Sequence, residues 1–184
     1  MLLEGVDRYR FPSDWSPDGK ILAYHEGTQG GWAAWMLPLD GQRKPYPFLS
    51  SQSSVRDVAF SPDGKWVAYC SNESGEYKVY IAPFPGPGGK WQASPGGYCP
   101  RWRRDGKEIF YDSADNHLMA VEVRAHATYV ELGAAHALFE TRSYGVFGRF
   151  DVTADGQRFL VPYEAGQPST AIALVVNWTA DLKE

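Results

Sequence analysis

The dipeptide Asp-Gly recurs four times inside a similar phrase, and this recurrence constrains the fold more than any other feature of the 184-residue chain. The pairs begin at residues 18, 63, 105 and 155, so they are 45, 42 and 50 residues apart. Repeats of about 40–45 residues are typical of β-propeller blades. Each Asp-Gly precedes an apolar run, and glycine there can take the positive φ of a hairpin reversal. The repeat therefore predicts one blade per copy.

Further strands are expected in every copy, separated by Gly-, Pro- and Asp-rich turns. After the strand that follows each Asp-Gly, we expect a third strand at residues 32–39, 77–84, 118–123 and 171–176, and an outer strand at 47–49, 91–93 and 137–140. No segment combines helix caps with a sustained 3.6-residue apolar period. We therefore predict an all-β fold of four antiparallel meanders of three to four strands. They form a single β-propeller domain over residues 1–184, with blades at about 8–52, 53–95, 96–141 and 142–184.

The first two copies share the phrase Ser-Pro-Asp-Gly-Lys after an aromatic residue, at 15–20 and 60–65. This phrase resembles the TolB-like, WD-repeat-like propeller family, whose repeats also form the propeller of the tricorn protease. Residues 83–92 and 177–183 resemble propeller segments that follow the kinase domain of bacterial serine/threonine kinases. The third and fourth copies depart from the phrase, with Arg103-Arg104 and Thr153-Ala154 in place of Ser-Pro. The resemblance implies a propeller fold without fixing a function.

The resemblance implies roughly six to eight blades, within the general propeller range of about 4–8, whereas this sequence encodes four. The chain could close a four-bladed ring, pair with a second copy into an eight-bladed ring, or be a fragment whose terminal blades pair with something else. An open arc exposes strand edges and apolar blade faces, which tend to find partners. We therefore expect self-association, with a homodimer closing an eight-bladed propeller.

Composition excludes several classes of function. The net charge is −4 and no basic block stands out, so we expect no nucleic-acid partner. No apolar run is long enough to span a membrane, and acidic residues near Met1 do not fit a secretory signal. We expect a soluble protein, cytoplasmic or periplasmic if it was cut from a longer one. Cys70 and Cys99 lack metal-ligand spacing and are expected to be small buried residues.

Motifs for catalysis are absent: there is no G-x-S-x-G elbow, no phosphate loop and no pair of histidines at zincin spacing. The histidines are scattered, so we predict no catalytic residue, no metal site and no cofactor. The repeated aspartates are expected to serve the turns. Trp15, Trp66 and Trp102 occupy repeat positions and are expected in the cores between blades.

The innermost strands of a propeller line its channel. Counting back from each Asp-Gly gives five candidate ligand-binding residues at the channel mouth: Asp14, Arg56, Asp57, Arg101 and Arg149. The leading hypothesis is a non-catalytic binding or scaffold module that presents this surface to a protein, peptide or small ligand. The competing hypothesis is a propeller hydrolase, such as a lactonase, a glycosidase or a peptidase-associated propeller, with its site in the central channel. A purely structural oligomeriser is the third possibility.

Overall fold

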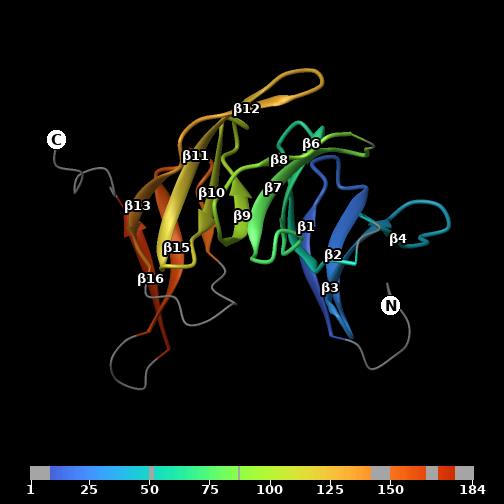
Figure 1. Ribbon diagram of the computed structural model, residues 1–184, viewed down its shortest axis with the longest axis horizontal. Coiled ribbons are helices and arrows are strands. Elements are labelled where there is room, and N and C mark those ends of the chain that lie inside the picture. Colours follow the sequence, from blue (N-terminus) through green and yellow to red (C-terminus); the bar gives the residue numbers. More distant parts are fainter. Residues whose placement is uncertain (1–8, 50–51, 87, 142–149, 165–169, 177–184) are drawn as a thin grey trace.

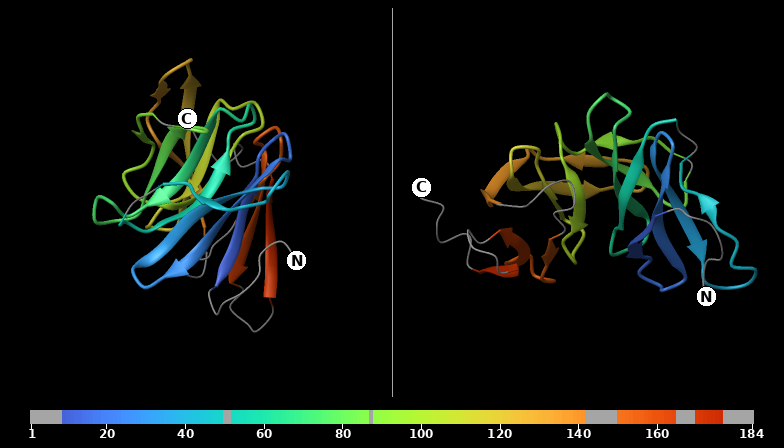
Figure 2. Two further views of the ribbon diagram at one scale, coloured as in Figure 1. Left: turned by 90° about the vertical axis from the view of Figure 1, so that its right-hand side faces the viewer. Right: turned by 90° about the horizontal axis from the view of Figure 1, so that it is seen from below.

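The computed structural model describes residues 9–49, 52–86, 88–141, 150–164 and 170–176, and within these ranges the chain is all-β with no helix. Its strands form four antiparallel sheets, each built from consecutive strands, as the repeat predicts. Figure 1 shows the four sheets side by side in chain order, and Figure 2 shows from below that they follow an arch. The innermost strand of blade 2 contacts the innermost strands of both blade 1 and blade 3.

Blades 1 and 2 are regular four-stranded meanders with the strand order of the sequence. Blade 1 consists of β1 (Arg10–Trp15), β2 (Ile21–Thr28), β3 (Gly31–Pro38) and β4 (Tyr46–Pro47). Blade 2 consists of β5 (Val55–Phe60), β6 (Trp66–Ser71), β7 (Lys78–Pro83) and β8 (Trp91–Gln92). The predicted third and outer strands of both blades occur within a few residues of their expected positions.

Blades 3 and 4 are less regular. Blade 3 consists of β9 (Tyr98–Trp102), β10 (Glu108–Asp112), β11 (His117–Ala125), β12 (Val130–Leu132) and β13 (His136–Glu140). The long strand β11 pairs with β12 near its end and with β13 near its start, so one outer strand was predicted where two short ones form. The described part of blade 4 consists of β14 (Asp151–Val152), β15 (Arg158–Glu164) and β16 (Thr170–Val176).

The Asp-Gly turns of all four blades share one hydrogen bond, from the amide two residues after the aspartate to its carboxylate. In blade 2, the Asp63 carboxylate accepts from the Ser61 hydroxyl at 2.6 Å and from the Lys65 amide at 3.1 Å. Asp18, Asp105 and Asp155 also accept from the amide two residues on. The four glycines have φ between 69° and 73°, a region that side chains rarely adopt. The repeated aspartates are therefore turn residues, as predicted.

The partner of the turn aspartate varies between blades. Blades 1 and 2 use a serine hydroxyl, and blade 4 uses that of Thr153. In blade 3, the Arg103 guanidinium donates to both oxygens of Asp105, at 2.8 and 2.9 Å. These hydrogen bonds hold the pKa of the Asp18, Asp105 and Asp155 carboxyls below the ordinary value. Different side chains thus stabilise the same backbone turn.

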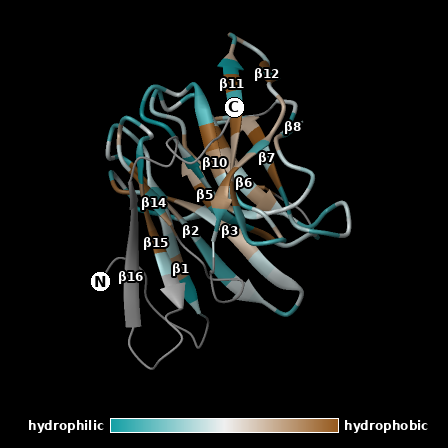
Figure 3. Cartoon of the chain, turned by 90° about the vertical axis from the view of Figure 1, so that its left-hand side faces the viewer, coloured by the Kyte–Doolittle hydropathy of each residue, from teal (hydrophilic) through white to brown (hydrophobic). Residues whose placement is uncertain are grey.

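Three apolar cores lie between successive blades, and alternate residues of each middle strand contribute to different cores. In β6, Val67 and Tyr69 pack toward blade 1, whereas Trp66, Ala68 and Cys70 pack toward blade 3. The core between blades 3 and 4 includes Phe110 from β10 and Phe159 from β15. In Figure 3, hydrophobic residues lie mainly in the strands and hydrophilic residues mainly in the turns that join them. Each inner blade therefore has two apolar faces.

Trp66 and Trp102 are buried in the core between blades 2 and 3, as predicted. The same prediction is wrong for Trp15, which is 53% exposed. Its repeat position faces the preceding blade, and within the described residues no blade precedes blade 1. Cys70 and Cys99 are both free and buried, as expected.

Candidate functional site: a pocket on the channel side

A pocket of about 500 Å³ lies where the inner strands of three blades converge. Blade 1 contributes residues of β1, blade 3 contributes one residue of β9, and blade 4 contributes β14, the residue before it and part of β15. The lining residues are Ser13, Asp14, Arg101, Phe150, Asp151, Leu160, Val161 and Pro162. Two of the five predicted ligand-binding residues, Asp14 and Arg101, therefore share one pocket.

Irregular pairing positions these side chains. The register between inner and middle strands shifts in all of β1, β5 and β9, between Pro12 and Asp14, between Arg56 and Ala59, and between Tyr98 and Arg101. Within the last two shifts, Asp57 and Cys99 have positive φ of 52° and 53°. Bulges of this kind redirect the side chains that follow them. Asp14 and Arg101 each follow such a shift.

Asp14 joins two blades as well as lining the pocket. Its carboxylate accepts from the Trp15 amide at 2.8 Å and, across the interface, from the Phe60 amide at 2.8 Å. Burial raises the pKa of the Asp14 carboxyl, an effect opposed by the Phe60 and Trp15 amides and by the Arg101 charge. One of its roles is therefore structural, because it ties β1 to β5.

Arg101 is half-buried and carries the only cation among the described residues that line the pocket. Its guanidinium donates to the Pro100 carbonyl at 2.9 Å. Among the described residues, no carboxylate oxygen lies within the 4.0 Å that defines an ion pair with it. Asp14 and Asp112 are nonetheless near enough for their charges to interact with Arg101. The pocket thus holds a partly desolvated guanidinium whose charge no described carboxylate neutralises by direct contact.

Asp112, at the end of β10, is not in the pocket lining, but its charge interacts with that of Arg101. Burial raises the pKa of its carboxyl to about 7, and the charge of Arg101 opposes the rise. A carboxyl of this kind exchanges its proton near neutral pH. Asp112 is a residue that sequence reasoning missed, because its burial depends on packing rather than on a motif.

Asp151 was not among the residues predicted from the sequence, although its position in the repeat indicates it. It lies four residues before the repeat aspartate of its copy, as Asp14 and Arg101 do in theirs. The same counting that selected Asp14 therefore selects Asp151.

Arg56 and Asp57 are not in the pocket lining. Their side chains are 2% and 5% exposed and form an ion pair of 2.7 Å between Nε and Oδ2. The Arg56 guanidinium also lies over the Trp32 ring of blade 1, and the Cys99 thiol of blade 3 approaches Asp57. This pair connects three blades from within. The remaining candidate, Arg149, lies outside the described residues.

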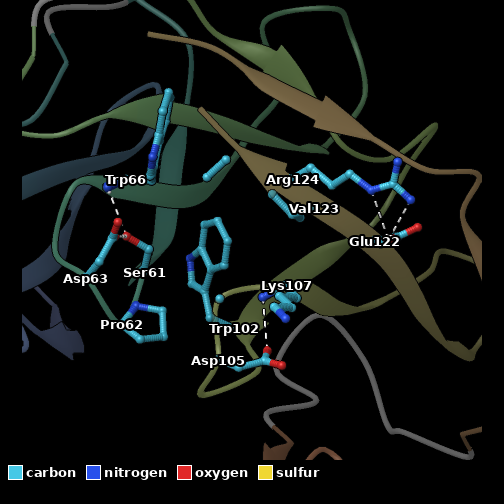
Figure 4. A pocket seen from close by; sticks show the side chains of 12 residues that line it. Ser61, Pro62, Asp63, Trp66, Trp102, Asp105, Lys107, Glu122, Val123 and Arg124 are labelled. Atoms are coloured by element: carbon cyan, nitrogen blue, oxygen red, sulfur yellow. Dashed lines mark hydrogen bonds and ion pairs between the residues drawn. The ribbon is translucent and has the colours of Figure 1, made fainter. Parts of the chain in front are cut away.

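A second cavity of about 670 Å³ lies between blades 2 and 3 (Figure 4). Its apolar wall is formed by Trp66, Trp102 and Val123. Val123 of blade 3 is the counterpart of Phe84 of blade 2. In each blade, the amide of this residue donates to the carbonyl of the lysine that follows Asp-Gly. Phe84 packs on Phe60, whereas the smaller valine leaves this gap.

Most polar groups around this second cavity are already satisfied. Arg124 donates twice to Glu122, and Trp102 Nε1 donates to the Ala59 carbonyl at 3.1 Å. Asp63 and Asp105 accept the hydrogen bonds of their turns. We therefore assign this cavity to imperfect packing and regard the channel pocket as the candidate site.

Within the described ranges, no group of three or more His, Cys, Asp or Glu side chains is placed to hold a metal ion. Those ranges also contain no helix that is long and apolar enough to cross a membrane.

The arrangement of radially adjacent antiparallel sheets defines the chain as a β-propeller protein. No protein-family model and no curated protein matches it. Among solved structures, TolB from Acinetobacter baumannii superimposes with a TM-score of 0.68 at 17% identity, over 90% of this chain and 40% of that one. A putative TolB from Agrobacterium tumefaciens superimposes with a TM-score of 0.63 at 20% identity, over 89% of this chain and 60% of that one. The fold is TolB-like.

An enzyme-related structure shares the fold as well. A putative 6-phosphogluconolactonase from Bacteroides uniformis gives a TM-score of 0.55 at 16% identity, over 92% of this chain and 55% of that one. The chain therefore spans 40% to 60% of the length of these three structures. The resemblance to segments that follow bacterial kinase domains stays a prediction.

Proposed function

We propose that the chain is a non-catalytic binding module that holds a peptide or protein segment in the channel pocket. The observation that carries the proposal is Arg101, a half-buried guanidinium that has no carboxylate in direct contact among the described residues. A guanidinium binds a carboxylate through two parallel hydrogen bonds, and partial burial strengthens them. The ligand is therefore expected to bring a carboxylate to Arg101.

The acidic residues of the pocket indicate the rest of the ligand. Asp14 and Asp151 line the same pocket as Arg101, so hydrogen-bond donors of the ligand would meet carboxylates. A peptide main chain with a free carboxylate supplies both kinds of group. The pocket volume of about 500 Å³ lies within the usual range for ligand sites, about 300–1,000 Å³.

The test is selection of peptides from a random library displayed on phage, followed by affinity measurements on synthetic copies with free and amidated C-termini. Replacing Arg101 by alanine should weaken the selected peptides about tenfold or more, the size expected for a charge-assisted hydrogen-bonded pair. Arg104 is exposed and outside the pocket lining, so Arg104→Ala is the matched control and should leave affinity unchanged. Peptides that bind both variants equally well would contradict the proposal.

The second candidate function is a hydrolase, and Asp112 favours it, because a carboxyl with a pKa of about 7 can act as a general acid or base. The likeness to the putative lactonase concerns the fold alone. A panel of lactones and esters tests this candidate. Turnover that is lost in Asp112→Asn would support a hydrolase, whereas no turnover with any member of the panel would leave the binding module.

A further inference from the structure

We infer that the two ends of the arch are complementary halves of one interface, and that a second copy of the chain closes it. Blade 4 of each copy would pack on blade 1 of the other, giving an eight-bladed ring. This inference rests on the packing between blades, and two of the residues that carry it, Asp151 and Leu160, also line the channel pocket.

The interface between blades repeats within the chain, so its two sides can be defined. The side that faces the preceding blade carries an aromatic residue at the end of the inner strand, Phe60 in blade 2 and Trp102 in blade 3, both buried. The side that faces the following blade carries the third residue after Asp-Gly-Lys. This residue is Ala68 in blade 2 and Phe110 in blade 3. Both of these are fully buried.

Blade 1 presents the first side without a described partner. Trp15 occupies the position of Phe60 and Trp102 but is 53% exposed. Tyr24 is the counterpart of Tyr69 in the repeat and belongs to the same face of blade 1, but it is already buried within the chain. The open part of this face is therefore centred on Trp15.

Blade 4 presents the second side. Leu160 occupies the position of Ala68 and Phe110 but is 46% exposed. Trp15 and Leu160 are two of the few large apolar side chains that stay exposed in the described chain, and they belong to β1 of blade 1 and β15 of blade 4. Their placement fits a contact between ends better than scattered surface exposure.

The Asp14 and Asp151 carboxylates occupy the same position of the repeat in blades 1 and 4. Asp14 bonds the amide of the next residue with Oδ1 and the Phe60 amide of the following blade with Oδ2. Asp151 is the counterpart of Asp14 in blade 4, and its Oδ1 bonds the Val152 amide at 2.8 Å in the same way. Within the described residues, its second oxygen has no such partner. Blade 4 thus carries an acceptor where blade 1 uses one to bond blade 2, although the Trp15 amide at the corresponding position of blade 1 already donates to Asp14.

A second copy supplies a face for each end at once. Two arches related by a two-fold axis form the same contact twice, and no end stays open, which is the closed arrangement that symmetric oligomers favour. A single additional blade from another protein would satisfy one end and expose a new one. The second copy would also enclose the channel pocket, which the arch leaves open.

Sedimentation velocity of the purified chain over a wide concentration range tests the inference. We expect a species of about twice the 20.5 kDa chain mass that dissociates on dilution. Trp15→Glu and Leu160→Glu should each weaken this association about tenfold or more, because each buries a charge in an apolar contact. Tyr129→Glu is the control, since Tyr129 is also exposed but lies on the β11–β12 hairpin, away from both ends.

Circular dichroism of the variants separates loss of association from loss of folding, since both sites are exposed in the single chain. A monomer at every concentration would overturn the inference. So would a dimer that Trp15→Glu disrupts and Leu160→Glu leaves intact, because that result indicates two Trp15 faces in contact. Masses that grow without limit would show that the ends join into filaments rather than a ring.

Discussion

Trp102 and Trp15 occupy the same position of the repeat, but their environments are opposite. Trp102 is 9% exposed, packs between blades 2 and 3, and donates its indole N–H to the Ala59 carbonyl. Trp15 is 53% exposed at the open face of blade 1. The comparison teaches that a repeat position specifies which way a side chain points, whereas the neighbouring blade decides whether it is buried.

The largest expected effect tests this comparison directly. Trp102→Ala removes a buried indole and leaves a cavity, so it should lower the free energy of unfolding by about 3–5 kcal/mol. Trp15→Ala should cost less than about 1 kcal/mol in the monomer, because the side chain already contacts solvent. Urea denaturation, at protein concentrations too low for association, measures the free energy of unfolding of both variants. Equal losses would show that blade 1 has an enclosed neighbour in the single chain.

Ion pairs offer the next contrast between enclosed and open regions. Asp57→Ala removes the ion-pair partner of the buried Arg56 guanidinium and should cost about 3 kcal/mol or more. Glu122→Ala breaks an exposed pair with Arg124 and should cost between about 0 and 1 kcal/mol. Denaturation in low and in high salt separates the two, since only the exposed pair is screened. A salt-sensitive loss in Asp57→Ala would contradict the enclosure of that pair.

The fold was predictable because its determinants are local. Asp-Gly turns, and the apolar strands after them, follow from hydrogen bonds within a few residues of each turn. The split outer edge of blade 3 was not predictable, because β12 and β13 both pair with the long strand β11. Tertiary pairing, rather than local preference, selected that arrangement.

The channel site was predictable only in part. Counting back from Asp-Gly located Asp14 and Arg101, since that distance is the same in every copy. The burial of Arg56 and Asp57 was not predictable, because a register shift in β5 changes which side chains face the channel. The environment of Asp112 depends on burial by residues distant in sequence.

Asp112 makes stability depend on pH. Its pKa is about 7 in the folded protein, above the ordinary value of 3.8, so the folded state binds the proton more tightly than the unfolded state. This contribution is fully present below about pH 4, is lost as the pH rises through 7, and amounts to about 1–3 kcal/mol. Asp112→Asn should flatten the loss of stability between these pH values, as measured by urea midpoints. An unchanged profile would show that another group dominates this range.

The smallest expected effect compares two enclosed interfaces. Phe84 fills the space beside Phe60, whereas Val123 leaves the cavity between blades 2 and 3. Val123→Phe should fill part of that cavity and raise the free energy of unfolding by about 0.5–1 kcal/mol. Val123→Ile is the control for a smaller increase in volume. A loss of stability in both variants would show that the cavity cannot accommodate added atoms without strain.

The Asp-Gly turn has a consequence for recognising distant copies of this repeat. Serine, threonine and arginine all hold the turn aspartate, while the glycine keeps the same positive φ in all four blades. Proline is present before the aspartate in only two of the four copies. A search for diverged blades in other sequences should therefore weight the aspartate and glycine heavily and the residues before them lightly. Scored in this way, copies such as those at 105 and 155 become as detectable as the first two.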